Sequence, residues 1–451
     1  MKTTELKNSI KIVVPYLLYG TLCGSVTGAV IFFFKFVAKN LEEITQGIYS
    51  FARENIIYVP LVFIGLILLA FCEYFLHKRI PEVKGGGIPR TEGILRGILS
   101  FKWLKTLVGT LVGSFISFFA GLPLGSEGPA VLIGTSLGGM CGKISGKGSA
   151  RQRYIMSGGA GAGFAVATGA PISGMLFVIE EVHKKFAPTL ILIVSVTVIA
   201  ATSVNKALCS LFNVNDALFD FGLLPNFNVR YIAYLVLAGV VLAFAVGAFD
   251  ASVEHISDLT AKVKKYLPRP LKLVLLFVTV GAFGLWFGEV VFSGHHVIGE
   301  VVSGHFDISF LLILLLLRMA LLLLATDSGA TGGIYIPTLT IGVISAAIVA
   351  NLMSLIGMPE ELVPLVAVIG MCAFLGGTLR SPFVALVFFV EITEGLGNVF
   401  YAAVAIFVVN IFTTFFDQKP FYDMVLEKME KNAKKYPVDK AKGKADKYTK
   451  L

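Results

Sequence analysis

Residues 121–130 constrain the fold most, because they place a carboxylate among glycines and prolines between two apolar runs. They read Gly-Leu-Pro-Leu-Gly-Ser-Glu-Gly-Pro-Ala, and residues 106–120 and 130–139 beside them are mostly apolar. An ionisable side chain at membrane depth is energetically costly and normally faces a cavity or a pathway. Glycines allow a sharp turn, and Pro129 fits the first turn of a helix. We therefore predict a broken membrane helix whose positively polarised N-terminus faces a site holding the Glu127 carboxylate. The alternative is a carboxylate that reaches from a helix end to the membrane surface.

The same pattern of a glycine turn followed by a proline occurs twice more. Residues 85–89 read Gly-Gly-Gly-Ile-Pro, and residues 332–337 read Gly-Gly-Ile-Tyr-Ile-Pro, each at the start of an apolar run. Three such helix starts in one chain favour a shared site over a set of unrelated turns.

These three motifs resemble the anion-site motifs of the CLC family of chloride channels and chloride/proton antiporters. The resemblance extends to residues 170–181 and 380–391 and to Lys-Pro-Phe-Tyr-Asp at 419–423, and it covers residues 12 to 430 in order. It implies an all-α polytopic membrane protein with an inverted-repeat CLC-type fold, in which broken helices meet at a central anion site. The sequence itself shows a repeat, because residues 170–180 parallel 381–391, but it does not show the inversion.

The composition independently indicates a polytopic membrane protein. Hydrophobic residues make up 56% of the 451 residues and charged residues 15%. No cleavable signal peptide is expected, since residues 1–11 are polar and the apolar run behind them is long. The cysteines are scattered through apolar segments, which favours packed thiols over disulfides or a metal site; they are Cys23, Cys72, Cys141, Cys209 and Cys372.

The net charge of +9 is not interpreted as nucleic-acid binding, because the basic residues gather in short connections. Residues 273–317 and 319–379 contain no Lys or Arg. This distribution follows the positive-inside rule and predicts a multi-pass protein of the plasma membrane with both termini in the cytoplasm. The expected cytoplasmic clusters are 77–84, 143–153, 183–185, 262–272 and the tail 428–450.

The expected organisation is two membrane repeats around a polar connection. We predict a lead-in at 1–11, a first repeat at 12–211, a connection at 212–229, a second repeat at 230–427 and a solvated basic tail at 428–451. Several predicted helices are too short to cross a bilayer, as expected for broken helices that line a cavity. The predicted helical segments are 12–38, 59–77, 85–99, 101–120, 129–142, 154–168, 171–182, 187–211, 231–255, 271–291, 308–325, 334–356, 362–377, 382–392, 399–416 and a last helix from 420.

The resemblance also implies roles for individual residues. Glu127 would be the gating carboxylate and Glu181 the internal proton-transfer residue, while Glu180 and Glu391 would be structural. The alternative for Glu180 and Glu181 is a pair of helix-end carboxylates neutralised by Lys184 and Lys185. The anion would be bound by backbone N–H groups of the three motifs and by one tyrosine hydroxyl, at Gly86, Gly87, Ile88, Gly128, Ile334, Tyr335 and Tyr422. The alternative for Tyr422 is an aromatic anchor at the membrane surface.

Two positions depart from the family pattern. Gly86 stands where Ser or Pro is common, so it offers only a backbone N–H and leaves the anion selectivity open. Ser126 stands where a basic residue is common before the gating glutamate, which removes a charge that would attract anions.

His295, His296 and His305 raise the possibility of a metal site in a membrane enzyme. No pair of metal-ligating residues with helical spacing accompanies them, so we expect a polar extracellular loop, no metal and no cofactor. No nucleophile–base constellation supports an enzyme.

The function that we expect is transport of chloride or a similar anion coupled to proton counter-transport. The alternatives are a passive anion channel and a CLC-type fluoride/proton exporter, although the latter lacks the internal glutamate. The resemblance further implies a homodimer in the lipid bilayer with a pathway in each subunit. Regulation by nucleotides is not expected.

Overall fold

The computed structural model describes residues 3–145, 149–263, 268–304, 306–416 and 418–435. Within these ranges the secondary structure is helical, and the one extended pairing is an isolated antiparallel bridge between Gly125 and Gly333. The expected all-α fold is therefore confirmed.

Within its described residues the first half contains eight α-helices, and apart from α1 their boundaries lie close to the expected ones. A single π-helical turn, Val178–His183, follows the seventh of them. The helices are α1 (Thr3–Glu54), α2 (Val59–Arg79), α3 (Gly87–Leu95), α4 (Trp103–Phe119), α5 (Glu127–Ile144), α6 (Ser149–Thr168), α7 (Pro171–Phe177) and α8 (Pro188–Phe212).

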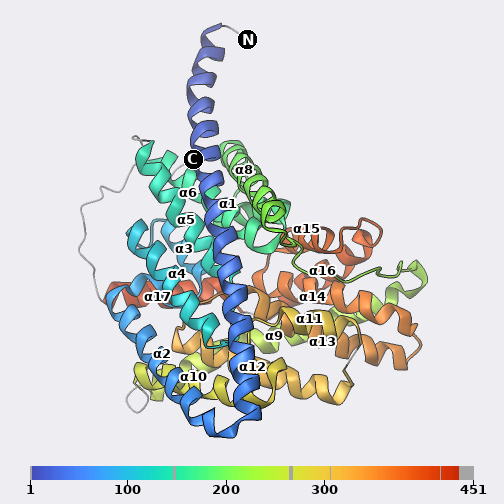
Figure 1. Ribbon diagram of the computed structural model, residues 1–451. Helices are drawn as coiled ribbons and strands as arrows, with labels where there is room; N and C mark the ends of the chain where they lie inside the picture. The colour runs from blue at the N-terminus through green and yellow to red at the C-terminus, as the bar shows by residue number, and fades with distance from the viewer. Residues whose placement is uncertain (1–2, 146–148, 264–267, 305, 417, 436–451) are drawn as a thin grey trace.

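The second half begins after an irregular connection, and its described residues contain nine α-helices. The last of them, α17, runs among the helices of the first half and contacts α3 (Figure 1). The helices are α9 (Ile232–Val263), α10 (Arg269–Trp286), α11 (His295–Val302), α12 (Ile308–Ser328), α13 (Tyr335–Leu355), α14 (Val363–Leu379), α15 (Pro382–Thr393), α16 (Val399–Thr413) and α17 (Phe421–Lys435).

Eight helices in the described part of the chain are long and apolar enough to cross a membrane. Others are too short to span about 30 Å of hydrocarbon, which needs roughly 20 helical residues. Helices α3 and α7, for example, have 9 and 7 residues. Helix α3 is almost entirely buried and α7 is buried on one face, so surrounding protein can satisfy their free backbone groups.

Helix α1 is much longer than predicted. It begins at Thr3, inside the expected lead-in, and continues to Glu54 instead of ending near residue 38. Its last turns pack on the end of α4, where the Thr45 hydroxyl donates to the Phe119 carbonyl at 2.8 Å and the Tyr49 hydroxyl to the Ala120 carbonyl at 2.8 Å. These contacts stabilise a helical segment that is too polar to be recognised as a membrane span.

Three further expectations about loops differ from the structure. The polar loop expected at the histidines contains α11, because Val297, Ile298, Val301 and Val302 bury one face of this short helix; His305 lies outside the described residues. The connection expected at 143–153 is shorter, since α5 and α6 extend into it. The expected solvated tail is helical to Lys435, and residues 436–451 lie outside the described residues.

Glycines allow α5 and α6 to pack with their backbones in contact. A Cβ on Gly134 would lie 2.0 Å from the Gly159 carbonyl oxygen. Small residues permit this close packing in membrane proteins, where it provides much of the van der Waals energy of association. Four of the five free cysteines are buried as expected, whereas Cys72 is exposed.

Candidate anion and proton-transfer site

The three glycine motifs lie against one another and bring the N-termini of α3, α5 and α13 together. Gly125 and Gly333 exchange two backbone hydrogen bonds, each 2.7 Å long. A Cβ on Gly87 would lie 2.0 Å from the Gly128 carbonyl oxygen, and one on Gly128 would lie 2.8 Å from the Cα of Gly333. Only glycines allow this approach, so the motifs form one unit in which helix N-termini converge.

Glu127 is the first residue of α5 and is fully buried. Its Oε1 accepts a hydrogen bond from the Ser126 hydroxyl at 3.1 Å, and its carboxylate lies beside the backbone amide of Ile336 in the first turn of α13. The carboxylate thus lies between the starts of two helices, where the positive ends of the helix dipoles favour negative charge.

The predicted anion-binding positions lie around the same unit. Gly86 is the extended residue before α3, and Ile334 is the residue before α13. Both line a cavity of about 440 Å³, together with Gly332 of the third motif. Gly87, Ile88 and Tyr335 belong to the first turns of α3 and α13 and are buried.

Tyr422 on α17 is buried, and its hydroxyl has no hydrogen-bond partner within the described part of the chain. The hydroxyl lies close enough to Glu181 and Glu127 to interact electrostatically with both. The burial contradicts the alternative of an interfacial aromatic anchor. The Tyr335 hydroxyl is likewise buried without a partner among the described residues, a feature that the sequence did not indicate.

Glu180 and Glu181 lie on the π-helical turn after α7 and have different environments. Glu181 is buried, and the Ser381 hydroxyl donates to its Oε2 at 2.5 Å. Glu180 accepts backbone hydrogen bonds from Phe383 at 3.2 Å and Val384 at 2.7 Å, at the start of α15. The two carboxylates therefore have different hydrogen-bond partners.

Lys184, which the alternative interpretation paired with these glutamates, forms its ion pair with another residue. Lys184 donates to Asp423 of α17 at 2.8 Å, and Asp423 is also 3.9 Å from Arg96. Arg96 in turn lies 2.5 Å from the buried Glu92 of α3. Helix α17 is thus attached by ion pairs to α3 and to the segment after Glu181.

A second cavity, of about 650 Å³, reaches the unit at Ser126 and shares no lining residue with the first. Lys35 of α1 lines it, donates to the Val166 carbonyl at 2.9 Å and lies 3.8 Å from Asp216. Lys35 also interacts electrostatically with Glu127. A cation from α1 therefore stands near the position where the sequence motif lacks one.

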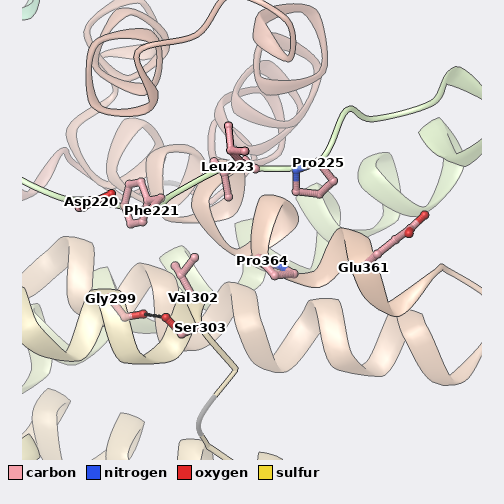
Figure 2. A pocket seen from close by; sticks show the side chains of 10 residues that line it. Asp220, Phe221, Leu223, Pro225, Gly299, Val302, Ser303, Glu361 and Pro364 are labelled. Atoms are coloured by element: carbon pink, nitrogen blue, oxygen red, sulfur yellow. Dashed lines mark hydrogen bonds between the residues drawn. The ribbon is translucent and has the colours of Figure 1, made fainter.

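A third cavity, of about 470 Å³, lies between the connection 212–229, α11 and the start of α14 (Figure 2). Its lining includes Asp220, Ser303 and Glu361 but none of the predicted site residues. We therefore assign it no part in the candidate site. His295 and His296, at the start of α11, line the second cavity instead. Nδ1 of His295 forms a hydrogen bond with the Ser293 hydroxyl at 2.9 Å.

Sequence reasoning missed a buried polar cluster behind the third motif. Glu73 and His77 of α2 are buried next to Thr331, whose backbone amide donates to Glu73 at 2.6 Å. A signal was present, because two ionisable residues four positions apart in an apolar helix require partners.

Comparisons with known proteins agree with this geometry. The family model described as voltage gated chloride channel matches residues 64–414. A relative named H(+)/Cl(-) exchange transporter ClcA, from Yersinia pseudotuberculosis serotype IB (strain PB1/+), is 29% identical over 433 residues, covering 94% of this chain and 89% of the relative.

Solved structures show the same fold. The crystal structure of a slow cyanobacterial Cl-/H+ antiporter superposes with a TM-score of 0.85 and 25% identity, covering 93% of this chain and 99% of the other. A CLC-type fluoride/proton antiporter has a TM-score of 0.72 at 20% identity, covering 92% and 98% of the two chains, and supports the fold alone. Family model, relatives and fold agree, and the chain belongs to the voltage-gated chloride channel (CLC) family of membrane proteins.

Proposed function

We propose that this protein exchanges chloride, or a similar small inorganic anion, for protons across the plasma membrane. The observation that carries the proposal is the Glu127 carboxylate, buried between the starts of α5 and α13. Helix N-termini bind anions through their free N–H groups, so the ionised carboxylate and a transported anion compete for the same environment. Protonation removes the charge of Glu127 and lets the anion take its place, which couples the two fluxes.

Glu181 is proposed as the inner proton acceptor. It is buried, it accepts from Ser381 at 2.5 Å, and it interacts electrostatically with Tyr422, which also faces Glu127. A proton that moves between the two glutamates therefore passes the Tyr422 region. The relatives named H(+)/Cl(-) exchange transporters and the Cl-/H+ antiporter structure support exchange over passive conduction.

We infer the orientation of the protein in the membrane from the distribution of its basic residues. The cavity that reaches Gly86 is lined by Lys84, Arg269, Lys272 and Lys428, all from the basic clusters assigned to the cytoplasm. We propose that this inner cavity opens to the cytoplasm, that the outer cavity at Ser126 opens to the exterior, and that both termini are cytoplasmic.

We also propose a homodimer within the bilayer, with one pathway per subunit. Large apolar side chains are exposed on neighbouring helices of the two halves, including Ile172 on α7 and Phe383 on α15. These side chains fit either lipid or a second copy, and the family resemblance favours the copy; the mass of the detergent-solubilised protein measures this.

The test uses purified protein in liposomes, with chloride flux and pH recorded together. Glu127→Gln keeps the shape but no longer titrates, so anion flux continues and anion-driven proton uptake is lost. In Glu181→Gln anion flux should likewise continue without proton uptake, because the inner proton acceptor has been removed.

Glu180→Gln is the matched control, one residue away on the same turn. It affects the cap of α15 and hence stability, while proton uptake per folded molecule remains. Proton uptake that persists in Glu181→Gln, or that is missing from the parent protein, contradicts the exchanger and favours a channel.

A further inference from the structure

The polar cluster behind the third motif has no role in the exchange proposed above. It consists of Glu73 and His77 of α2, Arg269 of α10 and Thr331 before α13. Glu73, His77 and Thr331 are each at most 1% exposed, although α2 is one of the apolar helices long enough to span the membrane. Buried ionisable groups in such a helix are costly unless they are paired, and they commonly serve function.

The hydrogen bonds of the cluster have a defined direction. Arg269 lies 3.2 Å from Nδ1 of His77, and a guanidinium can only donate, so Nδ1 is the acceptor. A neutral ring then carries its proton on Nε2, which donates to the Thr331 hydroxyl at 2.8 Å. That hydroxyl donates in turn to the Val83 carbonyl at 3.1 Å. We call this hydrogen-bonded series of side chains, Arg269–His77–Thr331, the relay.

The relay connects the loops of the first and third motifs. Val83 precedes Lys84 and the glycines at 85–87, while Thr331 directly precedes Gly332. Glu73 also contacts Thr331, since its Oε1 accepts a hydrogen bond from the Thr331 backbone amide at 2.6 Å. A further bond, from the Gly85 amide to the Gly329 carbonyl at 3.0 Å, links the two loops directly.

One end of the relay is at the inner cavity. Arg269 lines that cavity together with Gly86 and Ile334, the residues that precede α3 and α13. Gly86 has no side chain, so contacts of an anion with this position can come only from the backbone. Their strength therefore depends on how accurately the two loops are held apart, because a small displacement weakens a hydrogen bond steeply.

We propose that the relay, together with Glu73, is a positioning unit that sets the spacing of the first and third motifs for a small inorganic anion. This inference rests on the proposed function, since it assigns the spacing to the anion that is exchanged. The four residues act through the loops and do not themselves bind the anion in the central site.

The experiment compares His77→Leu and Thr331→Val with the parent protein. Equilibrium binding of chloride and of nitrate is measured by calorimetry in detergent, and the maximal exchange rate in liposomes at saturating anion. We expect chloride affinity to fall about five- to tenfold, the equivalent of one lost buried hydrogen bond, while the maximal rate changes less. Thr331→Val retains the backbone amide for Glu73, so it carries the test if His77→Leu does not fold.

Two controls separate positioning from general stability. His77→Gln offers one acceptor and one donor in place of the ring and should restore chloride affinity towards that of the parent. Thr45→Val removes a buried hydroxyl that lies 2.8 Å from the Leu41 carbonyl of α1 and 2.8 Å from the Phe119 carbonyl at the end of α4, far in sequence from both loops. It should lower the unfolding temperature without changing chloride affinity.

Unchanged affinity in both His77→Leu and Thr331→Val, or equal losses in Thr45→Val, overturns the positioning role. A parent protein that neither binds nor exchanges chloride, nitrate or fluoride contradicts the proposed function instead, so the two failures are distinguishable.

Discussion

At the scale of single residues, the candidate site depends on where a side chain is absent. Gly87 and Gly128 lie so close that neither tolerates a Cβ without displacing backbone, whereas Gly86 has room. A Cβ on Gly86 would lie 3.7 Å from the Gly332 carbonyl oxygen and 3.8 Å from Pro89, which are ordinary contacts. Gly86 also has φ −69°, a value that Ser and Pro both adopt. The close approach of the backbones therefore requires glycine at position 87, whereas at position 86 the structure has room for a side chain.

We predict that Gly86→Ser folds normally and raises the preference for chloride over nitrate, because it adds a hydroxyl donor. Gly86→Pro should shift the preference towards nitrate. Competitive exchange of the two anions in liposomes measures the ratio. The control Gly87→Ala should lose about 1–3 kcal/mol of stability or more, because overpacking forces the loops apart. Unchanged anion ratios in both Gly86 variants would exclude this position from the site.

At the scale of elements, the N-termini of α7 and α15 are each capped by a glutamate from the segment of the other helix. Glu391, near the end of α15, accepts from the backbone amides of Ile172 and Ser173 at 2.7 and 2.8 Å, at the start of α7. Glu180, just after α7, does the same for the start of α15. Such reciprocal caps require the two segments to run in opposite directions, so the repeat seen in the sequence is inverted here. A carboxylate at a helix N-terminus is also attracted to the positive end of the helix dipole.

We predict that Glu391→Gln destabilises the protein by about 1.5–3 kcal/mol, the range for hydrogen bonds to charged groups. Thermal unfolding in detergent measures the loss. Glu394→Gln, three residues further along, is the control, because Glu394 is exposed and forms no side-chain hydrogen bond within the described residues. Equal unfolding temperatures for the two variants would show that the cap contributes little.

At the scale of the whole molecule, the two cavities that approach the motifs differ in charge. The inner cavity is lined by four basic residues and by Asp327, which is paired with Lys272 at 2.6 Å. The outer cavity is lined by Lys35 and Lys39 but also by Glu42, Glu43 and Asp216. A cavity with an excess of one sign of charge concentrates ions of the opposite sign. The protein should therefore capture anions more readily from the side of the inner cavity, which we propose is the cytoplasmic side.

We predict that Lys84→Gln reduces anion uptake from the inner side by about two- to fivefold at low salt, and less above roughly 0.3 M of an impermeant salt, where screening is strong. Inside-out membrane vesicles give the required sidedness. Lys78→Gln is the control, because Lys78 belongs to the same basic cluster but is exposed and does not line the cavity. Equal rates in the two variants, or a loss that salt does not reduce, would contradict capture by charge.

The sequence by itself determined the local features of this protein. Apolar runs, with glycine and proline at their starts, placed most helices within a few residues and identified the helix starts around Glu127, because these features arise from neighbouring residues. The separate roles expected for Glu180 and Glu181 came from the family resemblance, and their different partners come from the tertiary structure. The tertiary structure alone decided which distant groups meet. Thr331 bonds Glu73 across 258 positions, and Lys184 pairs with Asp423 instead of the adjacent glutamates. The polar segment 39–54 is helical because it packs on α4. Such contacts depend on how helices rotate and pack in space, and no local pattern encodes that.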